Sequence, residues 1–468
     1  MRLPGLGNDL LNTDAPRWYR RTQNFMTAVK NGNFAQTYQH YQPGVTVMWL
    51  NAIPRYLNIK YQQSYSSEVK TLEHSGYFPT IHKISKGTLV FVLFFVFLYQ
   101  LFLIKSLFGS SVAYLYGFFT AIEPYFVGID RYFHLTSLET YFIFTSFLLL
   151  LLWNEKKISY FSLISGVFFA LSALSKITTI AVFPIFFYVY IFPFLRSKNY
   201  IDLKPLIYFS LSALLTFILV FPAMWVTPVE VVLKLYRAIF TAINEDSTIT
   251  SSSPLLNLFF YDLVLFYKMS PITYLIFVFS IFKLPFTSMF KQLKWVLVLI
   301  IFYWLVLTLS VKKIDRYAIV MFPFILLLAS SYVSILRISY QKLLIGLCLI
   351  YTGVVVYFYY PVYSSYYSFL FGGTNVALTL GIYDNSGEYY AQAAKYLNTK
   401  DRNTQILVPY NTDTFKYFSS GITLFAPTRN VDYIVTSIEH VNDVPIGFCV
   451  QENSFGNTTP IVFVYKCN

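Results

Sequence analysis

The feature that most constrains this chain is a series of apolar segments, which occupies most of the sequence between residues 87 and 360. A transmembrane helix needs about 20 mostly apolar residues, and lipid accepts only a backbone whose hydrogen bonds are satisfied internally. Only 12% of the residues are charged, about half the share found in soluble proteins. The sequence therefore predicts a mainly α-helical bundle with about ten membrane spans. The predicted spans are residues 87–107, 110–123, 135–153, 159–175, 177–195, 205–226, 270–288, 294–311, 317–336 and 342–360.

The charges between these segments predict their orientation. Lys and Arg accumulate in cytoplasmic loops, and alternate connections are rich in them. These cations are Lys105, Lys156, Lys157, Arg196, Lys198, Lys204, Lys283, Lys291, Lys294, Arg337 and Lys342. The other connections are then extracytoplasmic, as are the regions before residue 87 and after residue 360. Polar groups at membrane depth are costly and mark functional sites, so we expect a plasma-membrane protein whose active site lies on the outer face.

The composition also narrows the class of protein. The net charge of +13 does not indicate nucleic-acid binding, because the cytoplasmic loops of a membrane protein account for it. The sequence has no phosphate-binding loop, no dinucleotide fingerprint and no Cys and His spacing typical of a metal site. No cofactor is predicted, and a divalent metal ion has no support. Cys449 and Cys467 are candidates for a disulfide bond if their domain is extracytoplasmic, which the sequence leaves open.

The first 86 residues are polar and predict an extracytoplasmic catalytic loop. Asp14 suits a helix N-cap and Pro16 a first helical turn, so we expect an amphipathic helix over residues 14–31. A second short helix is expected over residues 43–56, and a polar loop over residues 57–86. Ten spans place both termini outside, and the sequence shows no signal peptide. An N-terminal region on the outer face normally follows a signal peptide or a membrane span. We therefore expect that a first transmembrane helix is missing from the sequence.

The composition changes again after Pro361, where strand-like segments alternate with turns. Residues 405–408 and 433–436 are predicted strands, and residues 388–397 a helix. The apolar stretch 254–269 contains charged residues, which favours an interfacial or re-entrant segment. The predicted domains are the outer loop (residues 1–86), the transmembrane domain (87–360) and a small extracytoplasmic α/β domain (361–468).

Two charged residues open the first predicted helix. Asp14 has two interpretations of similar weight: a helix cap, or a carboxylate at the membrane surface that acts as a general base on an acceptor hydroxyl or amine. Arg17 lies three residues later, on the same face of the helix. It is expected to orient Asp14 or to bind a phosphate, unless the pair is a plain surface salt bridge.

A second group of candidates lies in the outer connection between residues 123 and 134. Glu123 precedes a proline, so it is either a helix cap or a second catalytic carboxylate. Asp130, Arg131 and His134 follow within a few residues. Such a density of ionisable groups beside apolar spans favours function. Asp130 is a candidate catalytic group, and Arg131 and His134 are candidates for donor binding.

Three further cations are predicted on the outer face. Lys176 lies between two apolar spans, where the simple alternative is an ammonium group that reaches to the membrane surface. Lys313 and Arg316 belong to a second cluster, which is merely cytoplasmic if the topology of this half is inverted. If the topology holds, all three suit the phosphate of a lipid, and arginine can bind it through two nitrogens.

These predictions require a particular kind of substrate. A soluble nucleotide donor finds no recognisable site in the sequence, so the donor must already be embedded in the membrane. A polyprenyl-phosphate sugar meets this demand, because its lipid anchors it and its phosphate is a leaving group that Lys and Arg can stabilise.

Several short motifs, none specific alone, follow one another along nearly the whole chain. They are Asp14-Ala-Pro-Arg17-Trp18, Thr37-Tyr38-Gln39-His40-Tyr41-Gln42-Pro43-Gly44-Val45-Thr46, Val127-Gly-Ile-Asp-Arg131-Tyr-Phe-His134, Leu174-Ser-Lys176, Phe221-Pro-Ala-Met-Trp225-Val-Thr-Pro228, Lys312-Lys-Ile-Asp315-Arg316-Tyr317, and Gly372-Gly373 leading to Ala391–Asn398. In their order, the chain resembles the C superfamily of lipid-phosphate-dependent glycosyltransferases, specifically the protein O-mannosyltransferase-like group, glycosyltransferase family 39.

The resemblance implies a function. It implies transfer of mannose or a similar sugar from a polyprenyl-phosphate or dolichyl-phosphate donor to an unknown acceptor, with Asp14 as the catalytic carboxylate. It also implies that Lys176, Arg131 and Arg316 bind the lipid phosphate. Ala15 stands where the family usually has Glu after the catalytic Asp. The alternatives are a transporter or lipid-binding membrane protein, and an inactive relative of the glycosyltransferases.

Overall fold

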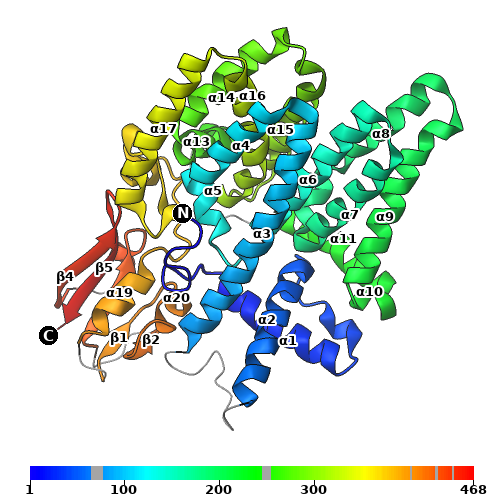
Figure 1. The fold of residues 1–468 in the computed structure, drawn as a ribbon. Helices are drawn as coiled ribbons and strands as arrows, with labels where there is room; N and C mark the ends of the chain where they lie inside the picture. The colour runs from blue at the N-terminus through cyan, green and yellow to red at the C-terminus, as the bar shows by residue number, and fades with distance from the viewer. Residues whose placement is uncertain (65–76, 245–253, 401–402, 427–430, 445–446, 468) are drawn as a thin grey trace.

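The computed structural model describes residues 1–64, 77–244, 254–400, 403–426, 431–444 and 447–467. It shows a bundle of long helices with a small five-stranded sheet at one end (Figure 1). Within the described residues, seven helices are long and apolar enough to cross a membrane, or eight with one bent pair counted as a single span. The predicted mainly α-helical membrane bundle is confirmed.

Each of the ten predicted segments is one helix or two consecutive helices. The long ones are α3 (Phe78–Phe108), α6 (Leu135–Lys156), η2 with α8 (Ile177–Ser197), η3 with α9 (Tyr200–Val220), α15 (Phe290–Leu309), η5 with α16 (Asp315–Ser334) and α17 (Ile338–Tyr359). The bent pair is α4 (Ser110–Ile122) and α5 (Pro124–Asp130), which meet at 72°. Two shorter apolar helices complete the set: α7 (Ser159–Ser175) and the segment of α14 and η4 (Pro271–Phe286).

The centre of the bundle is formed by α6 and α16. The apolar window of α6 is entirely buried, whereas only 11% of the window of α9 is. Helix α6 packs against α3 and α7, and α16 packs against α4 and α14. The outer helices expose large apolar side chains such as Phe95, Leu219 and Tyr357. Such a surface is suited to lipid, because it leaves no unsatisfied polar groups facing the hydrocarbon.

The N-terminal region differs from its prediction. The helix expected over residues 14–31 is α1 (Ala15–Lys30), but the second helix, α2 (Val45–Gln63), is longer than residues 43–56. Helix α3 begins at Phe78, so the loop expected over residues 57–86 is wrong in its described part. Residues 65–76 of that loop lie outside the described part.

The prediction of a loop failed because polar residues were taken as a sign of exposure. His82 and Lys86 are polar, yet both are buried on α3. Nζ of Lys86 lies 2.7 Å from the Asp9 carboxylate, and His82 shares a hydrogen bond with Tyr19. Partners elsewhere in the N-terminal region therefore satisfy the polar groups of this helix.

Short helices follow α9 over residues 223–268. They are α10 (Ala223–Val226), α11 (Pro228–Asn244), α12 (Pro254–Leu258) and α13 (Phe260–Lys268). Residues 245–253 are outside the described part. Lys268 is buried, and its Nζ lies 3.1 Å from the Asp315 carboxylate.

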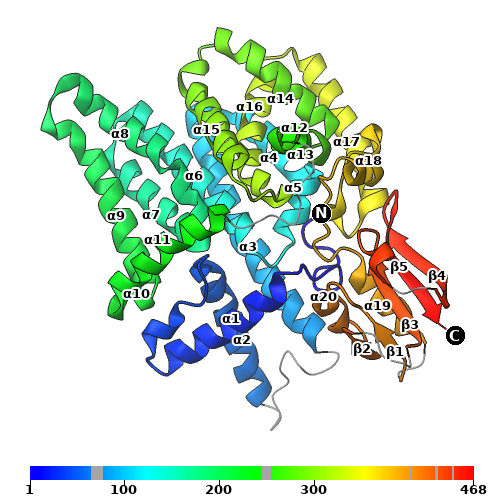
Figure 2. The same cartoon turned by 180° about the vertical axis from the view of Figure 1, so that it is seen from behind.

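The C-terminal part forms the predicted small α/β domain beside the bundle (Figures 1 and 2). Its sheet has the order β2-β1-β3-β5-β4, in which β1 is parallel to β2 and β3, and β5 is antiparallel to β3 and β4. Cys449 and Cys467 form a disulfide bond between β4 and β5. The strands are β1 (Gln405–Leu407), β2 (Ile422–Leu424), β3 (Tyr433–Ser437), β4 (Cys449–Gly456) and β5 (Pro460–Cys467); the helices are α18 (Gly373–Thr379), α19 (Tyr390–Leu397) and α20 (Thr412–Lys416).

Candidate active site

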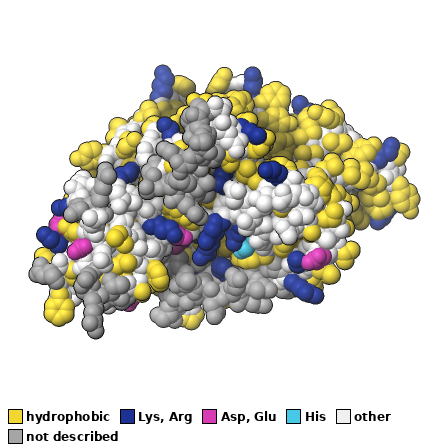
Figure 3. Space-filling model, turned by 90° about the horizontal axis from the view of Figure 1, so that it is seen from below, with side chains coloured by type: hydrophobic (Ala, Val, Ile, Leu, Met, Phe, Trp, Pro, Cys, Tyr) yellow, Lys and Arg dark blue, Asp and Glu magenta, His cyan; other side chains and the backbone are white. Residues whose placement is uncertain are grey.

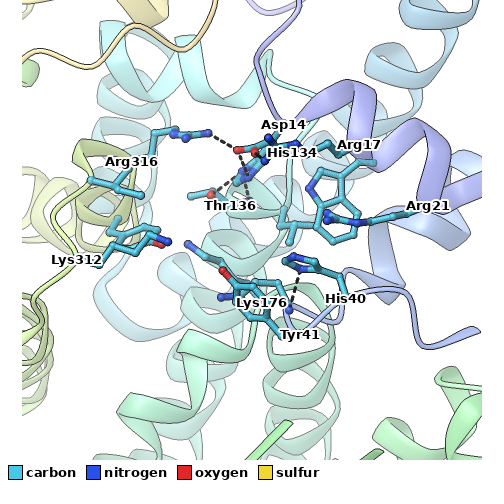
Figure 4. Close-up of a pocket in the computed structure, with 15 residues that line it drawn as sticks. Asp14, Arg17, Arg21, His40, Tyr41, His134, Thr136, Lys176, Lys312 and Arg316 are labelled. Carbon is cyan, nitrogen blue, oxygen red and sulfur yellow. Dashed lines mark hydrogen bonds and ion pairs between the residues drawn. The ribbon is translucent and has the colours of Figure 1, made fainter. Parts of the chain in front are cut away.

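A polar cavity of about 200 Å³ lies where α1 meets the ends of the central helices. It is lined by Asp14, Arg17, Trp18, Arg21, His40, Tyr41, Gln42, His134, Leu135, Thr136, Lys176, Lys312, Ile314, Arg316 and Tyr317. Figure 4 shows that these residues come from distant parts of the chain and point toward a common space. On the face seen in Figure 3, Lys and Arg side chains gather around a hollow, with a His side chain beside them.

Asp14 contacts cationic and polar groups in this cavity. It occupies the N-cap position of α1, but its side chain accepts no capping hydrogen bond. Its Oδ2 accepts a 3.0 Å hydrogen bond from Nη1 of Arg316 and lies 3.4 Å from Nε2 of His134. Nη1 of Arg17 is more distant, 3.9 Å from Oδ1. The side chain of Asp14 is therefore committed to the cavity and not to its own helix.

These contacts keep Asp14 ionised. Burial by itself raises the pKa of Asp14, but the His134 hydrogen bond and the Arg316 charge outweigh it and hold the pKa well below its usual value. Opposite charges and hydrogen bonds favour the carboxylate over the protonated form. The carboxylate is consequently available as a proton acceptor at neutral pH.

His134 is held in one tautomer by the start of α6. Its Nδ1 accepts a hydrogen bond from the backbone N–H of Thr136, which caps the helix. A neutral ring that accepts at Nδ1 carries its proton on Nε2, which faces Asp14. Burial lowers the pKa of His134 to about 4, so at neutral pH the ring is an uncharged donor to the carboxylate.

Lys176 lies at the junction of α7 and η2, with its side chain only 5% exposed. Its Nζ is 3.6 Å from Oε2 of Glu139 and 3.9 Å from the centre of the Tyr317 ring. Glu139 also accepts hydrogen bonds from Thr178 and Thr179. Sequence reasoning missed Glu139, although a lone carboxylate inside a predicted apolar span was a usable signal.

The two cations predicted in the second cluster, Lys313 and Arg316, lie in different environments. Arg316 lines the cavity and also lies near Asp384, with 3.9 Å between Nε and Oδ2. Lys313 does not line it, and Nζ donates instead to the carbonyl groups of Leu307 and Thr308 at the end of α15. The last carbonyls of a helix lack internal partners and attract cations. Lys312, the neighbour of Lys313, lines the cavity in its place.

Glu123 and Asp130 do not line the cavity. Oε1 of Glu123 accepts a 2.7 Å hydrogen bond from the backbone N–H of Ser270, near the bend between α4 and α5. Oδ2 of Asp130 accepts hydrogen bonds from Arg2 at 2.7 Å and Tyr141 at 2.9 Å. The segment between them is helical and buried, whereas the prediction treated it as an open loop. Its carboxylates therefore join the packed interior.

Arg131 likewise points away from the cavity. Its guanidinium lies 2.8 Å from the Asp9 carboxylate and donates to the carbonyl groups of Met1, Arg2 and Pro4. The side chains of Arg131 and Asp9 are almost completely buried. Of the four residues expected from this connection, only His134 lines the cavity, while Arg131 anchors the segment that leads to Asp14.

Comparisons with known proteins were made for the sequence and for the fold. No protein-family model matches the sequence, and no curated protein matches it. The structure resembles ArnT from Cupriavidus metallidurans bound to undecaprenyl phosphate, with a TM-score of 0.56 and 12% sequence identity over 99% of this chain and 95% of that chain. The apo state of the same protein gives a TM-score of 0.56 and 11% identity, with the same coverage of both chains.

A weaker likeness was found to the Archaeoglobus fulgidus oligosaccharyltransferase in complex with Zn and sulfate. Its TM-score is 0.42 at 11% identity, over 92% of this chain and 65% of that chain. Among the described residues of this chain, no group of three or more His, Cys, Asp and Glu side chains is arranged to hold a metal ion. The likeness to ArnT extends over nearly the whole of both chains. The two proteins therefore share a fold over nearly their whole length, as expected if the resemblance noted in the sequence holds.

Proposed function

We propose that this protein is a membrane glycosyltransferase that moves a sugar from a polyprenyl-phosphate donor to an acceptor on the extracytoplasmic face. The observation that carries the proposal is the cavity in which the Asp14 carboxylate lies beside Arg316 and which Lys176 also lines. The Asp14 carboxylate makes no capping hydrogen bond to its helix and lies among cations at the ends of apolar helices. This arrangement suits a reaction in which a nucleophile displaces a lipid phosphate.

The two buried cations would hold the donor phosphate. Lys176 and Arg316 are 5% and 13% exposed, so a phosphate between them would be largely shielded from water. Charge interactions are stronger in such a shielded site than in water. As the bond between the anomeric carbon of the sugar and the phosphate oxygen breaks, its electron pair passes to that oxygen. The cations stabilise the charge that develops there.

Asp14 would act on the acceptor. The acceptor hydroxyl or amine attacks the anomeric carbon, a new glycosidic bond forms, and the displaced proton passes to the Asp14 carboxylate. Arg316 links the two halves of the reaction, because it now donates to Asp14 and would also face the phosphate. A phosphate that draws Arg316 toward itself weakens this hydrogen bond and makes Asp14 a stronger base.

Two observations support the outer face. The residues of the cavity come from the regions that the alternation of charged connections predicts to be extracytoplasmic. The C-terminal domain, which the same alternation predicts on that side, contains a disulfide bond. Disulfide bonds persist mainly in oxidising compartments. The fold of ArnT, one structure of which contains undecaprenyl phosphate, supports a polyprenyl-phosphate donor. The resemblance to protein O-mannosyltransferases makes mannose the first sugar to test.

The test is a transfer assay with purified full-length protein in lipid nanodiscs. Polyprenyl phosphates that carry radiolabelled mannose, glucose, galactose or glucuronate are supplied with a membrane extract as the source of acceptor. We expect label from one or more donors to move to an acceptor, together with release of polyprenyl phosphate. If every donor is bound and none is consumed, the protein is a binding protein or an inactive relative, and the proposal fails.

A further inference from the structure

The cations of the cavity exceed what the proposed donor would neutralise. Five cationic side chains line it, namely Arg17, Arg21, Lys176, Lys312 and Arg316, against the single carboxylate of Asp14. A sugar linked through a phosphodiester carries one negative charge at that group. The carboxylates of Glu139 and Asp14 offset the charges of Lys176 and Arg316. Three positive charges then remain in and around the cavity, and one phosphodiester neutralises only one of them. The cations on α1 therefore need another explanation.

The two arginines on α1 form a separate wall of the cavity. Arg17 and Arg21 are four residues apart and share one face of the helix. Figure 4 shows them on the side of the cavity opposite Arg316 and Lys312. The Arg17 side chain is 64% exposed, in contrast to the buried Lys176 and Arg316. These arginines thus lie at the rim of the cavity, whereas the other pair lies in its depth.

Arg21 has no carboxylate within 4 Å among the described residues. Burial lowers the pKa of Arg21, the Asp14 charge partly offsets this, and the charges of Arg17 and Arg20 add to the lowering. Placing a partly buried arginine beside like charges costs free energy unless an anion binds there. The same helix carries Arg20, which is exposed and does not line the cavity. The cost therefore falls on Arg21.

The Arg21 side chain lies against a buried aromatic ring. The guanidinium of Arg21 stacks on Trp18, 4.5 Å from the ring centre, and Trp18 is buried against Gly44. A Cβ at Gly44 would lie 2.2 Å from the Trp18 ring, so only glycine permits this contact. A guanidinium that is held in place loses less entropy when it binds an anion.

His40 adds a neutral donor to the rim. It packs edge-on against Trp18, with 5.9 Å between the ring centres, and its Nδ1 accepts a hydrogen bond from the backbone N–H of Gln42. Burial, followed by the Arg21 charge, lowers the pKa of His40 to about 4. The ring is therefore neutral, with its proton on Nε2, in the wall of the cavity.

We propose that Arg17, Arg21 and His40 form a second anion subsite, distinct from the subsite of Lys176 and Arg316, which binds a carboxylate or phosphate group. A planar arginine fork beside a neutral N–H donor matches the oxygens of either group. Given the proposed function, the anion belongs either to the acceptor or to the transferred sugar. The substrate class is then an acidic acceptor or an acidic sugar.

The test asks whether one protein molecule binds two anions at the same time. Full-length protein in nanodiscs is titrated calorimetrically with inorganic phosphate, before and after saturation with a polyprenyl phosphate. We expect phosphate to bind the saturated protein, and Arg21→Gln to weaken this binding about tenfold or more, with Arg17→Gln acting in the same direction. The matched control Arg20→Gln should bind phosphate as the wild type does. All variants must keep the melting temperature of the wild type.

The source of the anion is found by comparing two donors, a polyprenyl-phosphate hexose and the corresponding hexuronate. If the sugar carries the anion, the hexuronate binds more tightly, Arg21→Gln removes the difference, and the bound hexuronate blocks phosphate. If the acceptor carries it, both donors bind equally and phosphate still binds beside each.

Two results would overturn the second subsite: phosphate that only competes with polyprenyl phosphate, or an Arg21→Gln variant with wild-type phosphate affinity. Failure of polyprenyl phosphate to bind at all contradicts the proposed function instead.

Discussion

Arg316 donates a 3.0 Å hydrogen bond to Asp14 across a separation of 302 residues. One partner lies in the N-terminal region before α3 and the other lies in η5, so the contact joins this region to the start of the span formed by η5 and α16. An arginine and a carboxylate in such contact stabilise each other's charged forms. The candidate base is therefore positioned by the tertiary fold and not by the helix it precedes.

Substitution of Asp14 by Asn should abolish sugar transfer. The amide keeps the size of the side chain but cannot accept a proton, and loss of a general base typically costs about 10²–10⁴ in rate. Donor binding should persist, because the phosphate is proposed to contact Lys176 and Arg316, not Asp14. The measurement is transfer of label under saturating donor, with polyprenyl-phosphate binding as the control for folding. Wild-type turnover in this variant would remove Asp14 from the mechanism.

Substitution of Lys176 by Met should weaken donor binding. The change deletes a buried cation and leaves Glu139 unpaired, and that carboxylate repels a phosphate. A lost charge-assisted hydrogen bond is worth about 1.5–3 kcal/mol, which corresponds to roughly tenfold or more in affinity. A double variant with Glu139→Gln removes the unpaired carboxylate, so it should recover thermal stability but not full donor affinity. Binding of radiolabelled polyprenyl phosphate checks both; equal affinity in wild type and double variant would contradict a phosphate role.

Substitution of Arg131 by Met should affect stability more than chemistry. Removing one partner of a buried ion pair typically costs about 3–5 kcal/mol, and here it also frees three backbone carbonyl groups. The expected result is a markedly lower melting temperature, with near-normal donor affinity in the folded fraction. The additional change Asp9→Leu should lower the melting temperature further, because it also leaves the buried Lys86 without its carboxylate partner. A large loss of donor affinity at normal stability would restore the phosphate role predicted from the sequence.

Acid should destabilise the protein through His134. An unfolded histidine has a pKa near 6.5, whereas the pKa of His134 in the fold is about 4. The unfolded chain therefore binds more protons between these values, and stability falls as the pH drops from about 6.5 toward 4. At pH 5 this group alone should cost about 2 kcal/mol relative to pH 7.5. Melting temperatures at the two pH values, compared with those of His134→Gln, measure the effect; an identical acid shift in the variant would refute it.

The proposed orientation predicts which cysteines react from outside the cell. In intact cells, a membrane-impermeant maleimide should label Cys449 and Cys467 only after treatment with an impermeant reductant. Cys348 is buried in α17 and should stay unlabelled in both conditions. Labelling of the pair only after permeabilisation would place the C-terminal domain in the cytoplasm and contradict the outer-face site.

The helices were predictable because lipid allows few alternatives: a long apolar segment has to satisfy its own backbone, so its composition is enough to identify it. The start of α3 was not predictable in this way, because His82 and Lys86 are polar and their buried partners lie far away in the sequence. Hydropathy reports the cost of burying a side chain but not the partner that offsets it.

The same limit explains why some predicted site residues line the cavity and others do not. His134, Lys176 and Arg316 lie between apolar spans and Asp14 lies in the polar N-terminal region; all four were predicted as site residues and line one cavity. Their chemical roles stay predictions. Arg131 interrupts apolar sequence in the same way, yet it binds Asp9. Polarity at a membrane boundary therefore identifies candidates, and only three-dimensional partners separate those that face a cavity from those that hold the fold together.

The segment before Asp14 is also tied to the C-terminal domain. The backbone N–H of Thr13 donates to the carbonyl of Ser386, Gln392 donates to the carbonyl of Asp9, and Lys395 to that of Asn8. The C-terminal domain thus works as a brace for the segment that leads to Asp14. A truncation at residue 360 would release this brace, so loss of activity in such a protein would not assign acceptor recognition to the domain.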